Sequence, residues 1–135
     1  MSQKIVFMGT PEFSVPTLES LVNSNNKVLA VYSQPASKAN RGQKIIPSQV
    51  ETFAKEHSLN LRTPDRLDND KEYNYLKKLE PDIVIVIAYG KIIPKKFLNL
   101  SKHGFINVHA SLLPKWRGAA PIQRSIMNLD NQTGI

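Results

Sequence analysis

Short apolar runs alternate with helix-like segments along the chain, and this alternation constrains the fold more than any other feature. Residues 3–8 and 27–33 are rich in β-branched and aromatic side chains, so we expect each to form a buried strand. Between them, Thr10 and Pro11 suit the N-cap and first position of a helix that runs to about Val22. Strand, helix and strand in this order form a βαβ unit, whose two strands lie parallel.

The rest of the chain extends this unit. Residues 82–88 are apolar at nearly every position, which predicts an interior strand with both faces covered. We expect further strands at 59–62, as a short edge strand, and at 105–109, and helices at 48–57, 70–79, 95–100 and 119–129. Ser48 and Glu51 have the spacing of a capping box, and the charges of 70–79 are expected to face solvent. The predicted fold class is α/β: an open, mostly parallel, Rossmann-like sheet with helices on both faces.

Composition narrows the classes of function. With 135 residues the chain has the size of one domain, and with no cysteine it can hold neither a disulfide nor a thiolate metal site. No apolar run approaches the ~18 residues of a membrane span, and the N-terminus shows no signal-peptide pattern. No glycine occurs between Gly9 and Gly42, so the G-x-G-x-x-G motif of nicotinamide and flavin sites is missing. We therefore expect a cytoplasmic protein with no membrane partner and no metal.

The net charge of +7 is unevenly placed. Residues 83–129 contain no Asp or Glu, whereas basic and acidic residues balance in the rest of the chain. The basic residues of this stretch are Lys91, Lys95, Lys96, Lys102, Lys115, Arg117 and Arg124. Such a stretch favours a polyanionic substrate or cofactor tail; the alternative is an incidental field of surface lysines.

Two polar residues end the predicted strand at 105–109. Asn107 and His109 are two positions apart, so both side chains project from one face of the strand. In open α/β sheets, ligands bind at the carboxyl ends of strands. A carboxamide beside an imidazole offers two donors to an oxygen that becomes negative, and a nitrogen that titrates near neutral pH. The pair suits acyl or formyl transfer, although polar residues at a strand end are often only satisfied structural groups.

A longer motif surrounds this pair. The segment Asn107-Val-His-Ala-Ser-Leu-Leu-Pro-Lys-Trp-Arg-Gly118 resembles the 10-formyltetrahydrofolate-dependent formyltransferases, and its continuation to Gln123 is similar to the methionyl-tRNA formyltransferase family in particular. Further matches to that family occur, in order, at 4–13, at Gln34-Pro35, Arg41-Gly42 and Pro47, and at 87–94. The resemblance thus extends over nearly the whole chain.

The resemblance implies transfer of a formyl group from 10-formyltetrahydrofolate to the α-amine of methionyl-initiator tRNA. Asn107 and a charged His109 would then stabilise the formyl oxygen, and His109 could shuttle the proton that the amine loses. The family's folate wall would be shaped by Ser111, Leu112, Leu113 and Pro114, and its pterin-facing loop would include Tyr89, Gly90 and Ile93. Folate and tRNA are the implied partners.

Residues 35–47 contain basic residues but no acid, and we expect them to form a long loop. By resemblance it is the insertion with which formyltransferases that act on tRNA grip the acceptor end. Arg41 is the first candidate because guanidinium binds phosphate in a bidentate manner, with Lys38 and Lys44 beside it. The alternative is a mobile, solvated loop.

The family pattern also has an aspartate that orients the histidine, and this aspartate lies beyond a Thr-Gly turn. The present sequence ends within that turn, at Ile135. Asp130 precedes the turn and does not match that aspartate. We expect residues 1–135 to be the N-terminal part of a formyltransferase catalytic domain, truncated before its remaining strands and the C-terminal barrel, with little activity alone. Two alternatives remain open: a formyltransferase acting on a small amine, and a non-catalytic RNA- or nucleotide-binding domain.

Overall fold

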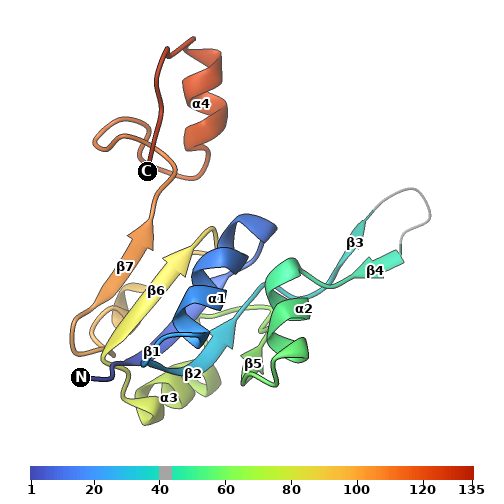
Figure 1. The fold of residues 1–135 in the computed structure, drawn as a ribbon, viewed down its shortest axis with the longest axis vertical. Helices are drawn as coiled ribbons and strands as arrows, with labels where there is room; N and C mark the ends of the chain where they lie inside the picture. The colour runs from blue at the N-terminus through green and yellow to red at the C-terminus, as the bar shows by residue number, and fades with distance from the viewer. Residues whose placement is uncertain (40–43) are drawn as a thin grey trace.

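A five-stranded, fully parallel sheet forms the centre of the protein (Figure 1). The computed structural model describes residues 1–39 and 44–135. Along the sheet the strand order is β5-β2-β1-β6-β7. The strands are β1 (Lys4–Gly9), β2 (Lys27–Tyr32), β5 (Leu61–Arg62), β6 (Ile83–Ile87) and β7 (Phe105–Val108). The predicted α/β class, the parallel sheet, the edge position of β5 and the interior position of β6 are all confirmed.

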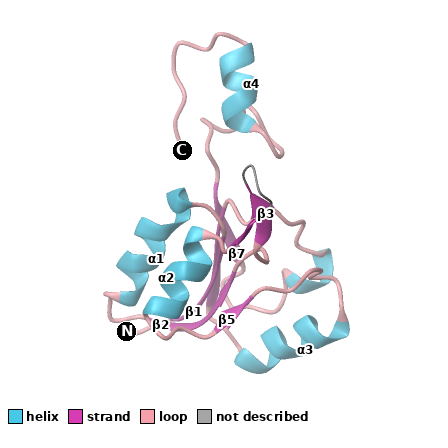
Figure 2. Cartoon of the chain, turned by 90° about the vertical axis from the view of Figure 1, so that its right-hand side faces the viewer, coloured by secondary structure: helices cyan, strands magenta, loops and turns pink. Residues whose placement is uncertain are grey.

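Helices cover both faces of this sheet, as predicted (Figure 2). On one face, α1 (Val15–Val22) and α2 (Gln49–Glu56) pack on a core cluster that includes Phe7. On the other face, α3 (Asp70–Leu79) and the short 3-10 helix η2 (Lys95–Phe97) pack on a cluster that includes Met8. Because Phe7 and Met8 are neighbours in β1, strand alternation alone sends them to opposite cores.

The C-terminal part of the chain stands off the sheet. After β7 the chain makes a series of turns, forms α4 (Pro121–Met127) and runs back beside it (Figure 1). The apolar side chains of α4 remain exposed at Ile122, Ile126 and Met127. None of the described helices is long and apolar enough to cross a membrane.

The turn after β1 differs from the prediction. A 3-10 helix, η1 (Glu12–Ser14), precedes α1, and its N-cap is Pro11, not Thr10. The Thr10 hydroxyl instead donates to the carbonyl of Tyr89, 2.8 Å away, so the predicted N-cap role is wrong. The turn packs tightly on β6: Ser14 Oγ donates to the Ile87 carbonyl at 2.7 Å, and a Cβ on Gly9 would lie 3.0 Å from that same oxygen. Glycine at position 9 therefore serves close packing between strands.

Helix α2 begins as its sequence predicts. Ser48 Oγ accepts from the Glu51 backbone N–H at 3.0 Å, the first half of a capping box. The second half does not form, and one Glu51 carboxylate oxygen instead accepts from Lys55 at 2.7 Å. Helix α3 has an N-cap that the sequence interpretation did not name: Asn69 Oδ1 accepts from the Glu72 N–H at 2.8 Å.

Residues 37–39 and 44–46 form strands where a loop was expected. The structure contains an antiparallel hairpin of β3 (Ser37–Ala39) and β4 (Lys44–Ile46), which leaves the sheet on the side of β2 (Figure 1). Backbone pairing satisfies the polar groups that an irregular loop would expose to water. Arg41 and Gly42 lie outside the described residues.

One charge of α3 is buried, contrary to the expectation of a solvated face. Arg62 Nη2 and Nε donate to the two Glu72 carboxylate oxygens at 2.6 and 2.8 Å, and the Glu72 side chain is only 5% exposed. The Arg62 guanidinium also lies 3.9 Å from the ring centroid of Tyr75. These hydrogen bonds from Arg62 lower the pKa of Glu72. The pair joins α3 to the edge strand β5.

Replacing Glu72 with glutamine is expected to lower the free energy of unfolding at pH 7 by about 2 kcal/mol, because hydrogen bonds between charged partners contribute more than neutral ones. Since folding depresses the Glu72 pKa, its contribution is present above the unfolded value of about 4.3 and is lost as pH falls through the folded value. Urea unfolding of both proteins from pH 7 to pH 3 measures this difference.

Asp68→Asn is the matched control, because Asp68 pairs with Arg66 where both side chains are largely exposed. We expect that control to change stability by less than about 0.5 kcal/mol. A difference between wild type and Glu72→Gln that stays constant down to pH 3 would contradict this account of the ion pair.

Candidate active site

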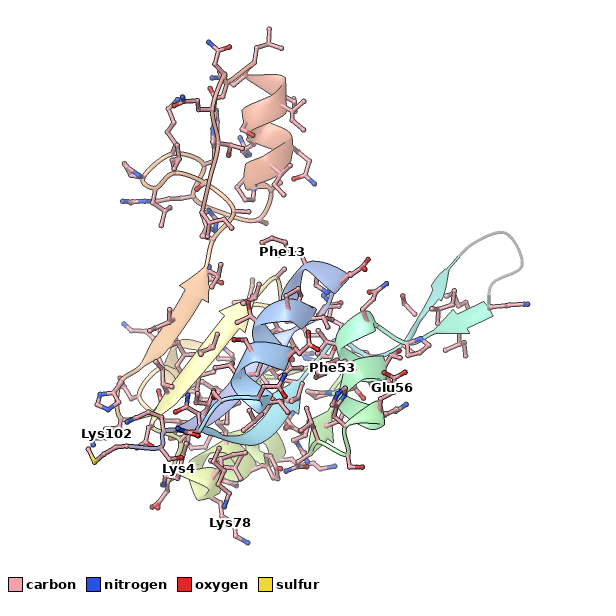
Figure 3. The ribbon with its side chains drawn as sticks, viewed as in Figure 1. Lys4, Phe13, Phe53, Glu56, Lys78 and Lys102 are labelled. Atoms are coloured by element: carbon pink, nitrogen blue, oxygen red, sulfur yellow. The ribbon has the colours of Figure 1, made fainter. Side chains whose placement is uncertain are left out.

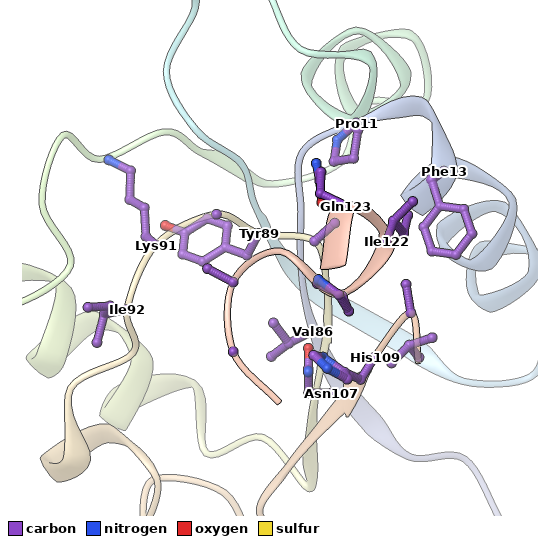
Figure 4. A pocket seen from close by; sticks show the side chains of 17 residues that line it. Pro11, Phe13, Val86, Tyr89, Lys91, Ile92, Asn107, His109, Ile122 and Gln123 are labelled. Atoms are coloured by element: carbon purple, nitrogen blue, oxygen red, sulfur yellow. The ribbon is translucent and has the colours of Figure 1, made fainter. Parts of the chain in front are cut away.

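A cavity of about 590 Å³ lies at the carboxyl ends of β1, β6 and β7 (Figure 4). From β1 the chain builds β2 and β5 on one side, whereas β6 and β7 lie on the other. The cavity is therefore at the switch point of the strand order, where open α/β sheets bind ligands. Three segments line it: Pro11 and Phe13, residues 86–92 except Ile87, and residues 107–123 in part.

Asn107 and His109 both line this cavity, and Figure 4 shows their side chains next to one another. Asn107 is the third residue of β7 and pairs in register with Val86 of β6, which lines the same wall. His109 follows the last residue of β7, so the two-residue period of the strand carries it to the same face. The carboxamide is exposed and the imidazole is half-buried, so each can reach a bound molecule.

The imidazole of His109 is anchored at one nitrogen. Its Nε2 lies 2.9 Å from the carbonyl oxygen of Trp116. A carbonyl oxygen only accepts hydrogen bonds, so Nε2 carries the proton in this arrangement. In the neutral ring, the basic lone pair is then on Nδ1.

The loop after β6 is held by two side chains from neighbouring strand ends. The carbonyl of Tyr89 accepts from Thr10 Oγ1 at 2.8 Å and from Gln34 Nε2 at 3.0 Å. Gly90 has φ +79°, and a Cβ there would collide with Gln34 Nε2, so any other residue would strain the backbone and displace the Gln34 side chain. The backbone of the loop is thus fixed along the cavity wall.

The side chains of this loop divide between core and cavity. The ring of Tyr89 is buried, and burial raises the pKa of its hydroxyl to about 12. Ile93, named with Tyr89 and Gly90 for the pterin-facing loop, packs against the core beneath α3 and does not line the cavity. Its neighbour Ile92 is 92% exposed and does line it.

Replacing Gly90 with alanine tests this loop. We expect a loss of about 1–3 kcal/mol in unfolding free energy, from the left-handed backbone and from the contact with Gln34. Gly104→Ala is the matched control, because Gly104 has φ +80° but nothing within 4 Å of the added Cβ. Chemical denaturation should show Gly90→Ala to be the more costly change, with the excess reduced in a Gln34→Ala background. Equal losses of unfolding free energy for the two glycine variants would contradict a specific contact between position 90 and Gln34.

The four residues expected to shape a folate wall lie outside the cavity lining: Ser111, Leu112, Leu113 and Pro114. After Ala110 the chain turns, with the Ser111 N–H donating to the His109 carbonyl at 2.9 Å. Ser111 is buried and its Oγ donates to the Lys115 carbonyl at 2.7 Å, whereas Leu112 and Leu113 are exposed. In this structure Ser111 supports the loop, and the three residues after it are exposed outside the cavity.

Residues after Pro114 line the cavity where the folate wall was expected. The cavity is lined by Gly118 and Ala119, which precede α4, and by Pro121, Ile122 and Gln123 in its first turn. Phe13, which follows β1, is 53% exposed and points from the sheet towards the C-terminal segment (Figure 3). The sequence interpretation did not name Phe13 as a site residue, because position 13 lies within the segment expected to be a helix.

Of the seven basic residues between positions 83 and 129, Lys91 is the one in the cavity lining. Lys91 Nζ donates to the carbonyl oxygens of Pro64 and Asp65. Lys102 lies at the end of the molecule away from Phe13, as Lys4 does (Figure 3). Lys91 thus lines the cavity with its ammonium engaged by backbone carbonyls, whereas Lys102 lies away from it.

The two lysines expected to bind tRNA, Lys38 and Lys44, also do not lie on one surface. Lys38 pairs with Ile45, and Lys44 with the residue after Lys38, so the two lysines project from opposite faces of the hairpin. Within the described residues, no group of His, Asp and Glu is placed to hold a metal ion.

Comparison with curated proteins finds long matches over the whole chain. A methionyl-tRNA formyltransferase of Pelagibacter ubique (strain HTCC1062) is 62% identical over 136 residues, covering 100% of this chain and 44% of the relative. A methionyl-tRNA formyltransferase of Coxiella burnetii is 51% identical over 135 residues, covering 100% of this chain and 43% of the relative. The chain thus spans less than half the length of these relatives.

Solved structures share the fold. Phosphoribosylglycinamide formyltransferase from Brucella melitensis superposes with a TM-score of 0.69 at 21% identity, over 95% of this chain and 67% of that one. A formyltetrahydrofolate deformylase from Pseudomonas syringae pv. tomato superposes with a TM-score of 0.67 at 19% identity, over 95% and 42%. At these identities the likeness concerns the fold alone.

A sequence model of a protein family also matches the chain. The model described as formyl transferase matches residues 3–135, which is nearly the entire chain. This chain belongs to the formyl transferase family.

Proposed function

We propose that this chain carries the formyl-transfer site of a methionyl-tRNA formyltransferase. The observation that carries the proposal is the placement of Asn107 and His109 on one wall of a cavity at the switch point of the sheet. The relatives that match the whole chain, at 62% and 51% identity, are methionyl-tRNA formyltransferases. A tRNA substrate also implies that the protein acts in the cytoplasm.

The cavity suits a folate that carries a formyl group. Its volume of about 590 Å³ is in the range of small-molecule sites, roughly 300–1,000 Å³. Val86, Ile92 and Phe13 provide apolar surface for flat rings, whereas Asn107 and His109 provide the polar groups. A few polar groups in a largely apolar cavity are what fixes the orientation of a ligand.

The reaction requires one bond to form and one to break. The α-amine of methionyl-tRNA bonds to the formyl carbon, the bond from that carbon to N10 of the folate breaks, and one proton passes from the amine to N10. The Asn107 amide and a charged His109 would donate hydrogen bonds to the formyl oxygen as it gains negative charge. As the bond to N10 breaks, His109 would give its Nδ1 proton to N10, and the neutral ring would then take up the proton that the amine loses, which restores the charged form.

The β3–β4 hairpin is the proposed contact for the acceptor end of tRNA. It extends from the sheet with exposed Lys38 and Lys44, which can each bind a phosphate as a point charge. Their opposite orientation suits two segments of a nucleic acid passing on either side of the hairpin. Arg41, between them in sequence, remains part of this proposal.

A chimera tests the proposed function. Residues 1–135 replace the matching segment of the Pelagibacter ubique relative, and formyl-methionyl-tRNA is measured after incubation with 10-formyltetrahydrofolate. We expect transfer by the chimera and little by the 135-residue chain alone. A chimera that folds but formylates only small amines, or nothing, would contradict the proposal.

Thermal unfolding of the chain with and without 10-formyltetrahydrofolate separates binding from catalysis. A ligand that binds only the folded state raises the melting temperature. The proposal predicts such a rise, and predicts that it survives at high salt. Stabilisation by tRNA that disappears with salt, without any effect of folate, would instead indicate a nucleic-acid-binding module.

A further inference from the structure

The carboxylate of Asp130 is an unassigned charged group near the site. It accepts from the Trp116 indole Nε1 at 2.6 Å and from the Asn128 amide at 2.7 Å, and it lies 3.5 Å from the Lys115 ammonium. Its side chain is only 9% exposed. The hydrogen bonds from Asn128 and Trp116 lower the pKa of this carboxyl. The mechanism above gives Asp130 no role.

Trp116 connects this carboxylate to the reactive imidazole. Its side chain donates to Asp130, while its backbone carbonyl accepts from His109 Nε2 at 2.9 Å. Its backbone has φ +55°, a left-handed conformation that is sterically disfavoured for any residue with a Cβ. A residue in this conformation persists only where its surroundings hold it, and here contacts at both ends do so.

Helix α4 in turn holds Asp130. The Asp130 N–H donates to the Ser125 carbonyl at 3.0 Å, closing the C-terminal end of the helix. The opposite end of the same helix supplies Pro121, Ile122 and Gln123 to the cavity. Asp130 therefore joins the helix that forms one cavity wall to the loop that anchors His109.

We propose that Asp130 is a positioning residue for His109: by holding the Trp116 indole it places the Trp116 carbonyl on Nε2 and leaves Nδ1 as the nitrogen that faces the substrate. The role in catalysis rests on the proposed function. The hydrogen bonding and protonation of the His109 ring do not depend on that function, and they can be measured in the chain without substrate.

Nitrogen-15 NMR of the histidine rings tests the placement directly. The chain has three histidines, so His57→Gln and His103→Gln variants assign the His109 signals. In the wild type, His109 should show a protonated Nε2 whose hydrogen exchanges slowly with water. Asp130→Ala and Trp116→Phe should each abolish that slow exchange, and the double variant should add no further change.

Two further variants separate positioning from a general effect on folding. Asp130→Asn keeps an oxygen that can accept from the indole, so part of the slow exchange should remain. Asp68→Asn, a change at an exposed carboxylate, should leave it unaltered. Trp116 is the only tryptophan, so its indole N–H resonance reports independently whether the bond to Asp130 is lost. A His109 signal that is unchanged in Asp130→Ala while the indole resonance moves would overturn the proposal.

Kinetics of the chimera test the effect of Asp130 on catalysis. Asp130→Ala should lower kcat by about 10- to 100-fold, with the KM for the formyl donor changed less than about twofold, as expected when a catalytic group is displaced slightly. Loss of slow exchange with unchanged kcat would overturn the catalytic part of the inference alone. A wild-type chimera without transfer activity would instead refute the proposed function, and the NMR result would still decide whether Asp130 positions the ring.

Discussion

Replacing His109 with alanine in the chimera is expected to lower kcat for formyl transfer by about 10²- to 10⁴-fold, the usual contribution of a positioned acid–base group. The side chain is half-buried on the cavity wall and one ring nitrogen is already engaged by Trp116. Alanine removes both the charge that would stabilise the formyl oxygen and the nitrogen that would carry the proton. Single-turnover kinetics with saturating substrates measures the loss.

His103→Ala is the matched control for this change. His103 is exposed and precedes β7, at the end of the strand opposite the cavity. We expect its kcat to stay within about twofold of the wild type, as for a surface residue without a special role. Wild-type kcat in the His109→Ala chimera would show that the imidazole takes no part in the transfer.

The second large effect is expected at Asn107. Leucine has a similar shape but no donor, and the loss of one donor to a developing oxyanion costs about 10²- to 10³-fold in kcat. The KM for the formyl donor should change little, because the hydrogen bond strengthens mainly as the oxygen becomes negative. Steady-state kinetics of Asn107→Leu in the chimera separates the two constants.

Asn74→Leu on the exposed side of α3 is the control for Asn107, since it makes the same substitution far from the cavity. If Asn107 and His109 act on the same oxygen, the double variant should lose less than the product of the two single losses. A rise in KM with unchanged kcat for Asn107→Leu would mean that the amide only binds the ground state.

The sequence allowed the sheet and the reactive pair to be predicted, for the same physical reason. Side chains alternate along a strand, so apolar runs such as β6 identify buried strands. The same alternation places Asn107 and His109 on one face before any coordinates are known. Periodicity of this kind depends only on the local backbone, which is why it can be derived from a single sequence.

Features that depend on contacts distant in sequence could not be predicted. Glu72 looks like a solvent-facing helix residue until Arg62 of β5 is brought beside it. Thr10 has the sequence context of an N-cap, but its hydroxyl donates to Tyr89, 79 positions away. Ser111 was expected in a binding wall, whereas the turn after Ala110 removes it from the cavity. Tertiary packing decided the cases of Glu72 and Thr10, whereas a local turn, with hydrogen bonds to His109 and Lys115, decided that of Ser111.

Formyl transfer at this site requires that a formyl-carrying folate reach both polar groups of the cavity at once. NMR titration of this chain with 10-formyltetrahydrofolate, following the side-chain amide of Asn107 and the ring of His109, tests this most directly. We predict that both signals shift and saturate with one dissociation constant, while the His103 ring does not move. Saturable binding that leaves the Asn107 and His109 signals unmoved would contradict the account.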